Sequence, residues 1–204
     1  APALASGNCV VAKPSEVTPM TACLLGTWAK EVGLPDGVLN ILHGLGPEVG
    51  QAMVDHHHVR AISFTGGSST GAAISAAAAP KFKKLSLELG GKNATVVFDD
   101  CDFDAALSTA IRSAFANQGQ ICLCGSRILV QDTIYERFRD AMVDKVSRMR
   151  IGDPMDPETK MGAVVSRAHR DKVLAAIATA RGEGGTILCG GGRHQPREYR
   201  LQGG

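Results

Sequence analysis

Two cysteines in one polar loop are the first residues whose type and position suggest chemistry. Cys122 and Cys124 follow residues 117–121, NQGQI, which come directly after a helical pattern. Attack by a thiol requires access and nearby donors that favour the thiolate, and a loop provides both more readily than a helix interior. The alternative is a buried cysteine at the start of the next strand. The loop therefore contains a candidate nucleophile.

A lone carboxylate is the second candidate. Glu88 lies near the end of residues 84–89, where apolar and polar side chains alternate as in a strand, and it is followed by Gly90 and Gly91. The simpler interpretation is an exposed strand residue that pairs with Lys92. The residue pattern alone leaves both interpretations open.

A glycine-rich segment at a strand-to-helix junction is the third candidate. Residues 64–71 read FTGGSSTG, and the unpaired N–H groups at a helix N-terminus can hold a phosphate. A capped turn is an equally good interpretation. Residues 43–50, HGLGPEVG, resemble a dinucleotide fingerprint but differ from it by one residue in spacing.

Two further polar clusters predict no site. His56, His57 and His58 are adjacent, so their side chains point in different directions, and no cysteine or carboxylate spacing completes a tetrahedral metal set. We expect an exposed turn there and no metal site. Lys81, Lys83 and Lys84 predict a solvated edge.

The composition excludes several classes of protein. With 204 residues, 44% of them hydrophobic, the chain can bury a core. The net charge of +2 is spread along the length, which argues against nucleic acid as a partner, and no apolar run approaches the roughly 20 residues that cross a membrane. Six dispersed cysteines predict reduced thiols and a cytoplasmic protein. The chain begins without Met and ends on Gly203 and Gly204, so we expect an internal excerpt of a longer protein.

Strands and helices must alternate to position these residues. The apolar pattern predicts an α/β fold with a mainly parallel sheet, right-handed crossovers and helices on both faces. The expected strands are residues 9–12, 38–42, 61–64, 84–89, 94–98, 127–130 and 186–188. The expected helices begin at Thr18-Pro19 and Pro47, cover about 69–80 and 102–117, begin again at Thr133, and end with 166–181. The Gly90-Gly91 pair is the predicted domain boundary.

Two motifs taken together resemble the aldehyde dehydrogenase superfamily. These are residues 87–93, LELGGKN, and residues 115–122, FANQGQIC, which place Glu88 and Cys122 34 residues apart. Residues 13–16, KPSE, and 64–66, FTG, also match. Within the superfamily, the surrounding residues look most similar to the aminomuconate and hydroxymuconate semialdehyde dehydrogenases.

The resemblance implies an enzyme that oxidises an aldehyde or semialdehyde to a carboxylic acid with NAD(P). Cys122 would form a covalent thiohemiacetal and then a thioester, and Glu88 would activate the water that hydrolyses it. It also implies a Rossmann-like NAD-binding domain, residues 1–90, and an α/β catalytic domain, residues 91–204, both partial. Family membership further predicts a homo-oligomer, either a dimer or a tetramer.

The cofactor site is expected to use NAD rather than NADP. By resemblance, Lys13 and Glu16 would meet the adenosine ribose, and Gly46 and Pro47 the adenine. The binding site for the pyrophosphate and the neighbouring part of the cofactor would be formed by Thr65, Gly66, Gly67, Ser68, Gly71 and Leu89.

Three departures from the family pattern limit this transfer. Gly67 stands where many members have Ser. The family's oxyanion-hole Asn and a Glu that holds the nicotinamide ribose fall outside this sequence, so we expect that the chain alone is inactive. Two alternatives stay open: a CoA-acylating aldehyde dehydrogenase, and a non-catalytic nucleotide-binding fragment.

Overall fold

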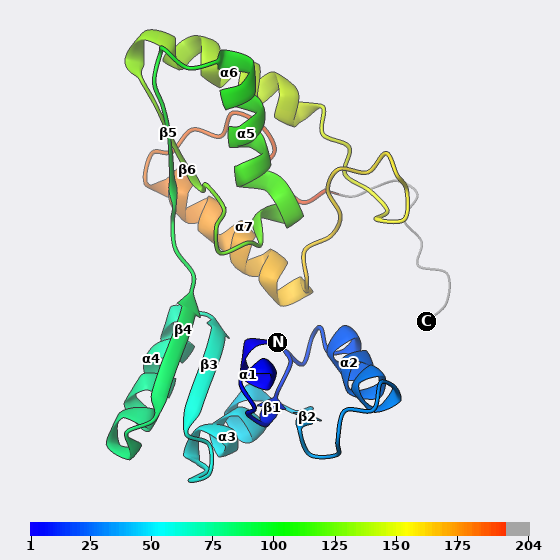
Figure 1. The fold of residues 1–204 in the computed structure, drawn as a ribbon. Coiled ribbons are helices and arrows are strands. Elements are labelled where there is room, and N and C mark those ends of the chain that lie inside the picture. The colour runs from blue at the N-terminus through cyan, green and yellow to red at the C-terminus, as the bar shows by residue number, and fades with distance from the viewer. Residues whose placement is uncertain (195–204) are drawn as a thin grey trace. The chain divides into compact units, whose positions relative to one another are not determined.

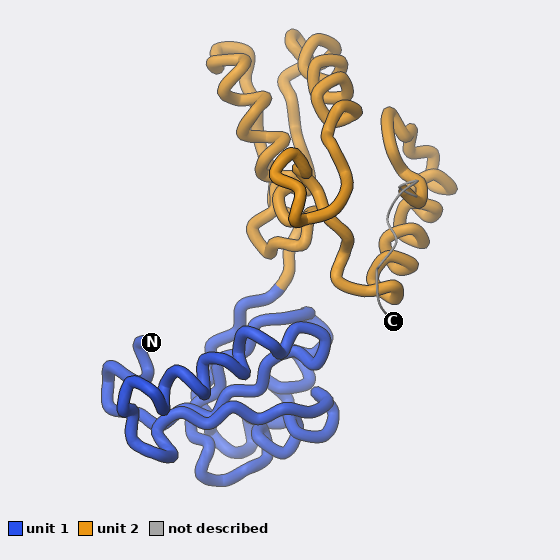
Figure 2. Tube along the Cα trace, turned by 90° about the vertical axis from the view of Figure 1, so that its right-hand side faces the viewer, with its two compact units in different colours: residues 1–89 blue, residues 90–204 orange. Residues whose placement is uncertain are grey.

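The computed structural model describes residues 1–194. Residues 195–204, which are the last ten residues of the predicted catalytic domain, lie outside the described part. The chain forms two compact units, residues 1–89 and 90–204 (Figure 2). Both are built from helices and parallel strand pairs, which confirms the predicted α/β class.

The first unit contains four short strands with helices between them (Figure 1). Its elements are α1 (Pro2–Ala5), β1 (Val10–Ala12), α2 (Met20–Glu31), β2 (Leu39–Ile41), η1 (Gly46–Gly50), α3 (Gln51–Asp55), β3 (Ala61–Gly66), α4 (Ser68–Ala78), η2 (Ala79–Lys81) and β4 (Lys84–Leu89). The strand β1 pairs in parallel with β2, and β3 with β4. Since parallel strands point the same way, the carboxyl ends of each pair lie at one edge.

The second unit is organised around one parallel strand pair and the helices that follow it. Its elements are β5 (Ala94–Val97), α5 (Phe103–Phe115), η3 (Ala116–Gly119), β6 (Arg127–Val130), η4 (Asp132–Ile134), α6 (Tyr135–Ser147) and α7 (Arg167–Gly182). Asp102 caps α5 by accepting a hydrogen bond from Ala105 N at 3.1 Å, and Ser166 caps α7 in the same way. The core consists of Val97, Leu107, Ala110 and Phe138.

The expectation of helices on both sheet faces is wrong for the described residues. Val97 of β5 is buried, whereas its neighbour Val96 is 55% exposed, and Leu129 of β6 is 52% exposed. Trp28, on the predicted apolar face of α2, is 52% exposed. Alternation along a strand tells which side chains share a face, but it does not tell what covers that face. The strands also form three separate pairs instead of one sheet.

Several predicted element boundaries need correction. Residues 186–188 form no strand, because a strand requires a partner ladder and none lies beside them in the described chain. The helix α2 begins at Met20 with Pro19 at the N-cap position and no side-chain cap, so Thr18 does not cap it. The helix α5 ends at Phe115, before the predicted Asn117, whose backbone is left-handed.

The lysine cluster after α4 is more than a solvated edge. Lys83 Nζ donates to the carbonyl oxygens of Val54 at 2.5 Å and His56 at 2.7 Å, and Lys81 forms an ion pair with Asp55. These carbonyls belong to the C-terminal end of α3, where a cation complements the helix dipole. Sequence reasoning missed this role because it depends on a contact between distant segments.

No helix in residues 1–194 combines the length and apolar character needed to cross a membrane.

Candidate active site

The two predicted cysteines lie in a loop between α5 and β6, residues 117–126, which we call the cysteine loop. It opens with three consecutive left-handed residues, Asn117, Gln118 and Gly119, with φ of 49°, 57° and 72°. Non-glycine residues rarely adopt this conformation, and such residues cluster at functional sites. This turn stops α5 and directs the chain into the segment that carries both thiols.

The two thiols differ in access. Cys122 is exposed, whereas Cys124 is buried with 7% of its surface accessible. A nucleophile must reach its substrate, so this difference favours Cys122 over Cys124. All six cysteines are free thiols.

Side chains of neighbouring elements hold the cysteine loop in place. Asn93 Nδ2 donates to the carbonyl oxygens of Cys122 at 2.7 Å and Cys124 at 3.2 Å. On the other side, Gly125 N donates to Ser113 Oγ at 3.0 Å. Sequence reasoning assigned no role to Asn93 or Ser113, although Asn93 lies inside the LELGGKN motif.

Gly125 is at the closest packing point of the loop. A Cβ atom there would overlap the hydroxyl of Thr95 on β5 and would lie 2.7 Å from Ser113 Oγ on α5. Only glycine lets the loop approach both elements without displacement.

Glu88 and most of the predicted phosphate-binding residues meet at one end of the β3/β4 pair. Glu88 is exposed and is the register partner of Thr65, and Leu89 is the partner of Gly66. A Cβ atom on Gly71 would lie 2.6 Å from Leu89 Cδ2, so this glycine allows the first turn of α4 to pack closely on β4.

The start of α4 retains the features of an anion site. Gly67 is the N-cap residue with extended backbone, no side chain caps the helix, and no acidic residue lies in the first turn. The first N–H groups of a helix have no intrahelical partner. The backbone amides from Ser68 onward are therefore suited to a phosphate group even though Gly67 offers no hydroxyl.

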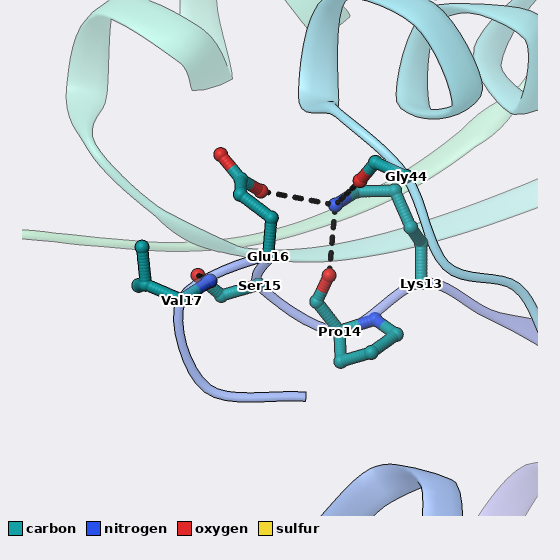
Figure 3. Close-up of polar contacts among 6 residues, drawn as sticks. All are labelled: Lys13, Pro14, Ser15, Glu16, Val17 and Gly44. Carbon is teal, nitrogen blue, oxygen red and sulfur yellow. Dashed lines mark hydrogen bonds and ion pairs between the residues drawn. The ribbon is translucent and has the colours of Figure 1, made fainter. Parts of the chain in front are cut away.

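The predicted ribose-binding residues lie at the carboxyl end of the β1/β2 pair (Figure 3). Lys13 Nζ donates to the carbonyl oxygens of Pro14 at 2.7 Å and Gly44 at 3.0 Å, and pairs with Glu16 at 3.4 Å. A hydrogen bond from its own backbone N–H, followed by the hydrogen bond from Lys13, holds the pKa of the Glu16 carboxyl below its usual value.

The predicted adenine-binding residues follow β2 on a short connection. Gly46 and Pro47 begin η1, and Gly44 just before them has a φ of 148°. A Cβ atom on Gly44 would overlap the Val49 side chain. Ligands of α/β proteins bind at the carboxyl ends of parallel strands, which is where both predicted sets of residues lie in this unit.

The described part of the chain shows no arranged set of metal ligands. Within residues 1–194, no cluster of three or more histidine, cysteine or acidic side chains is arranged to hold an ion. Each of the three adjacent histidines is exposed, as predicted.

Comparison with known proteins identifies the family. The profile of the "Aldehyde dehydrogenase family" matches residues 1–202. The chain belongs to this family. The predicted resemblance is therefore confirmed.

Several aldehyde dehydrogenases are similar to this chain in sequence and structure. The chain is 50% identical over 192 residues to 2-aminomuconic semialdehyde dehydrogenase of Bos taurus, covering 94% of this chain and 39% of the relative. It is 48% identical to 2-aminomuconic 6-semialdehyde dehydrogenase of Pseudomonas sp, again covering 94% and 39%. Betaine aldehyde dehydrogenase from Staphylococcus aureus, solved in complex with NAD+, superposes with a TM-score of 0.94 at 43% identity, covering 96% of this chain and 39% of that one. The chain thus spans about two fifths of the length of these relatives.

Proposed function

We propose that the protein oxidises an aldehyde to a carboxylic acid with NAD, using Cys122 as the nucleophile and Glu88 as the general base. The observation that carries the proposal is the exposed thiol of Cys122 in a loop that side chains of other elements hold in place. Residues 1–90 would bind the cofactor, and residues 91–204 would supply the nucleophile.

The residues present fit NAD. An uncapped helix start at Ser68, free of acidic side chains, suits a pyrophosphate, and the exposed Glu16 carboxylate suits the two hydroxyls of a ribose. When bound, NAD accepts the hydride that the aldehyde carbon must lose. Because its carboxylate would repel a 2′-phosphate, Glu16 favours NAD over NADP.

The residues of the chain divide the remaining chemistry between them. The Cys122 thiolate adds to the carbonyl carbon, and the Cys122 backbone N–H donates to the oxygen that becomes negative. Loss of hydride leaves a thioester on Cys122. Glu88 takes a proton from water as the water oxygen attacks the thioester carbon, and the acid leaves as the thiolate is restored.

We propose a semialdehyde as the substrate class, by similarity to the 2-aminomuconic semialdehyde dehydrogenases. The test is NADH formation by the native-length protein with 2-aminomuconic semialdehyde and with betaine aldehyde. We expect a higher kcat/KM for the semialdehyde, no turnover in Cys122→Ser with NAD binding intact, and near-normal turnover in Cys124→Ser. Loss of activity in Cys124→Ser alone would show that the other thiol is the nucleophile.

The rival CoA-acylating function lacks a specific observation in its favour. There a thiol, rather than water, resolves the thioester, and a carboxylate base such as Glu88 is not needed. A non-catalytic nucleotide-binding role would leave both Cys122 and Glu88 without a use.

We also propose that the protein works in the cytoplasm as a dimer or tetramer. Six free thiols support a reducing compartment. Membership of the aldehyde dehydrogenase family supports the assembly. Light scattering on the purified protein tests the assembly, and a monomeric mass would refute it.

A further inference from the structure

Asn93 is placed to control the backbone at Cys122. It directly precedes β5, and its side-chain nitrogen donates to two carbonyl oxygens of the cysteine loop, Cys122 O and Cys124 O. An amide nitrogen carries two N–H donors. One residue thus fixes two peptide groups on either side of Leu123.

Among the described residues, the carbonyl oxygen of Cys122 accepts its hydrogen bond from the Asn93 side chain and not from the backbone of the loop. Cys124 N donates to Ile121 O at 3.0 Å, and Ser126 N donates to Cys124 O at 2.9 Å. Within the described residues, no backbone N–H donates to the carbonyl oxygen of Cys122. The side chain of Asn93 supplies that hydrogen bond.

Asn93 is itself held by the strand pair. Its carbonyl oxygen accepts a hydrogen bond from Arg127 N at 3.1 Å, and Arg127 Nε donates to Lys92 O at 2.9 Å. Arg127 is the first residue of β6 and pairs with Ala94 of β5, and Asn93 directly precedes Ala94. The donor therefore sits on a rigid element, which is where a group that positions a reacting residue is most effective.

We infer that Asn93 is a positioning residue that sets the geometry of Cys122 for attack. The inference rests on the proposed function, in which the sulfur and the backbone N–H of Cys122 both act. Fixing the Cys122 carbonyl fixes rotation about its Cα–C bond, and with it the direction of the peptide groups around the sulfur. Small misplacements of reacting groups have large effects on rate, with about 1 Å able to cost 100-fold.

The test uses Asn93→Ala and Asn93→Asp in the native-length protein. The aspartate keeps the size of the side chain but presents oxygens in place of the N–H donors. Asn40→Ala is the matched control, because Asn40 Nδ2 also donates to two carbonyl oxygens, Gly37 at 2.8 Å and Val10 at 3.4 Å, in the other unit. The measurements are kcat and KM for aldehyde and NAD, backbone hydrogen exchange of peptides covering residues 117–126, and thermal unfolding.

We expect both Asn93 variants to lower kcat by about 10- to 100-fold. The KM for NAD should stay unchanged, and hydrogen exchange should be faster in the cysteine loop. Asn40→Ala should keep the parental kcat and loop exchange. Unchanged kcat in both Asn93 variants would overturn the inference even if the loop exchanges faster. Lowered kcat with unchanged loop exchange would also overturn it, because Asn93 would then act on the reaction directly. Faster loop exchange, together with normal turnover in Cys122→Ser, would instead refute the proposed nucleophile.

Discussion

At the scale of single residues, environment separates groups of the same chemical type. Cys122 and Cys124 lie two positions apart, yet one is exposed and the other is buried. Glu88 and Glu16 are both exposed carboxylates, but Glu16 pairs with Lys13 beside a strand end. The candidate residues can be named from the sequence, and the structure adds which of their side chains are exposed to solvent.

Glu16 leads to a prediction about cofactor choice. Glu16→Ala should raise kcat/KM for NADP relative to NAD by roughly tenfold or more, because a carboxylate near a 2′-phosphate repels it. The pKa of Glu16 is lowered, so the carboxylate stays charged through neutral and mildly acidic pH, and the parental NAD preference should not change across that range. A parental preference for NADP that survives the substitution would contradict the assignment.

The candidate site residues could be proposed from the sequence because two motifs are distinctive. The residues 87–93 and 115–122 pointed to Glu88 and Cys122 through family resemblance. Asn93 lies in the first motif but was not recognised, since its role depends on a hydrogen bond to a residue 29 positions away. Such a partner cannot be deduced from one sequence.

At the scale of elements, strands were predicted more accurately than the segments around them. Residues 84–89 and 127–130 are strands with the predicted bounds. Apolar and polar side chains alternate along 84–89 up to Gly90, and 127–130 contains a short apolar run, residues 128–130, between polar residues. A loop at residues 117–121 was expected, but the left-handed backbone of Asn117 and Gln118 was not, because non-glycine residues rarely adopt this conformation. Residues 186–188 have the composition of a strand but lack a partner.

The close approach of the cysteine loop to its neighbours leads to a second prediction. Gly125→Ala should destabilise the protein by about 1–3 kcal/mol, because the new methyl group meets the hydroxyls of Thr95 and Ser113 in a packed position. Chemical denaturation measures the change.

Ser113→Ala is the control for Gly125→Ala, since it removes the hydrogen bond to Gly125 N without adding volume. Its cost should be nearer 1 kcal/mol. Equal or greater destabilisation by Ser113→Ala would show that the hydrogen bond, and not the close packing, makes glycine necessary.

At the scale of the whole molecule, the two compact units divide the proposed work. The first carries the residues proposed to bind the cofactor, at the carboxyl ends of two parallel strand pairs. The second carries Cys122 and the side chains that hold its loop. The sequence predicts a domain boundary at Gly90-Gly91, and the second compact unit begins at Gly90. Which sheet faces are covered could not be predicted, because residue periodicity does not report what packs on a face.

The central claim is that a thioester forms on Cys122 and that Glu88 activates the water that hydrolyses it. The measurement that tests it most directly uses Glu88→Gln in the native-length protein, mixed rapidly with aldehyde and NAD, quenched and analysed by mass spectrometry. We predict a burst of NADH, steady turnover lowered by about 10²–10⁴-fold, and an acyl group that accumulates on the peptide containing Cys122. The absence of both the burst and the acyl group would contradict the account, because Glu88 would then act before hydride transfer. Unchanged turnover that CoA accelerates would replace hydrolysis with acyl transfer.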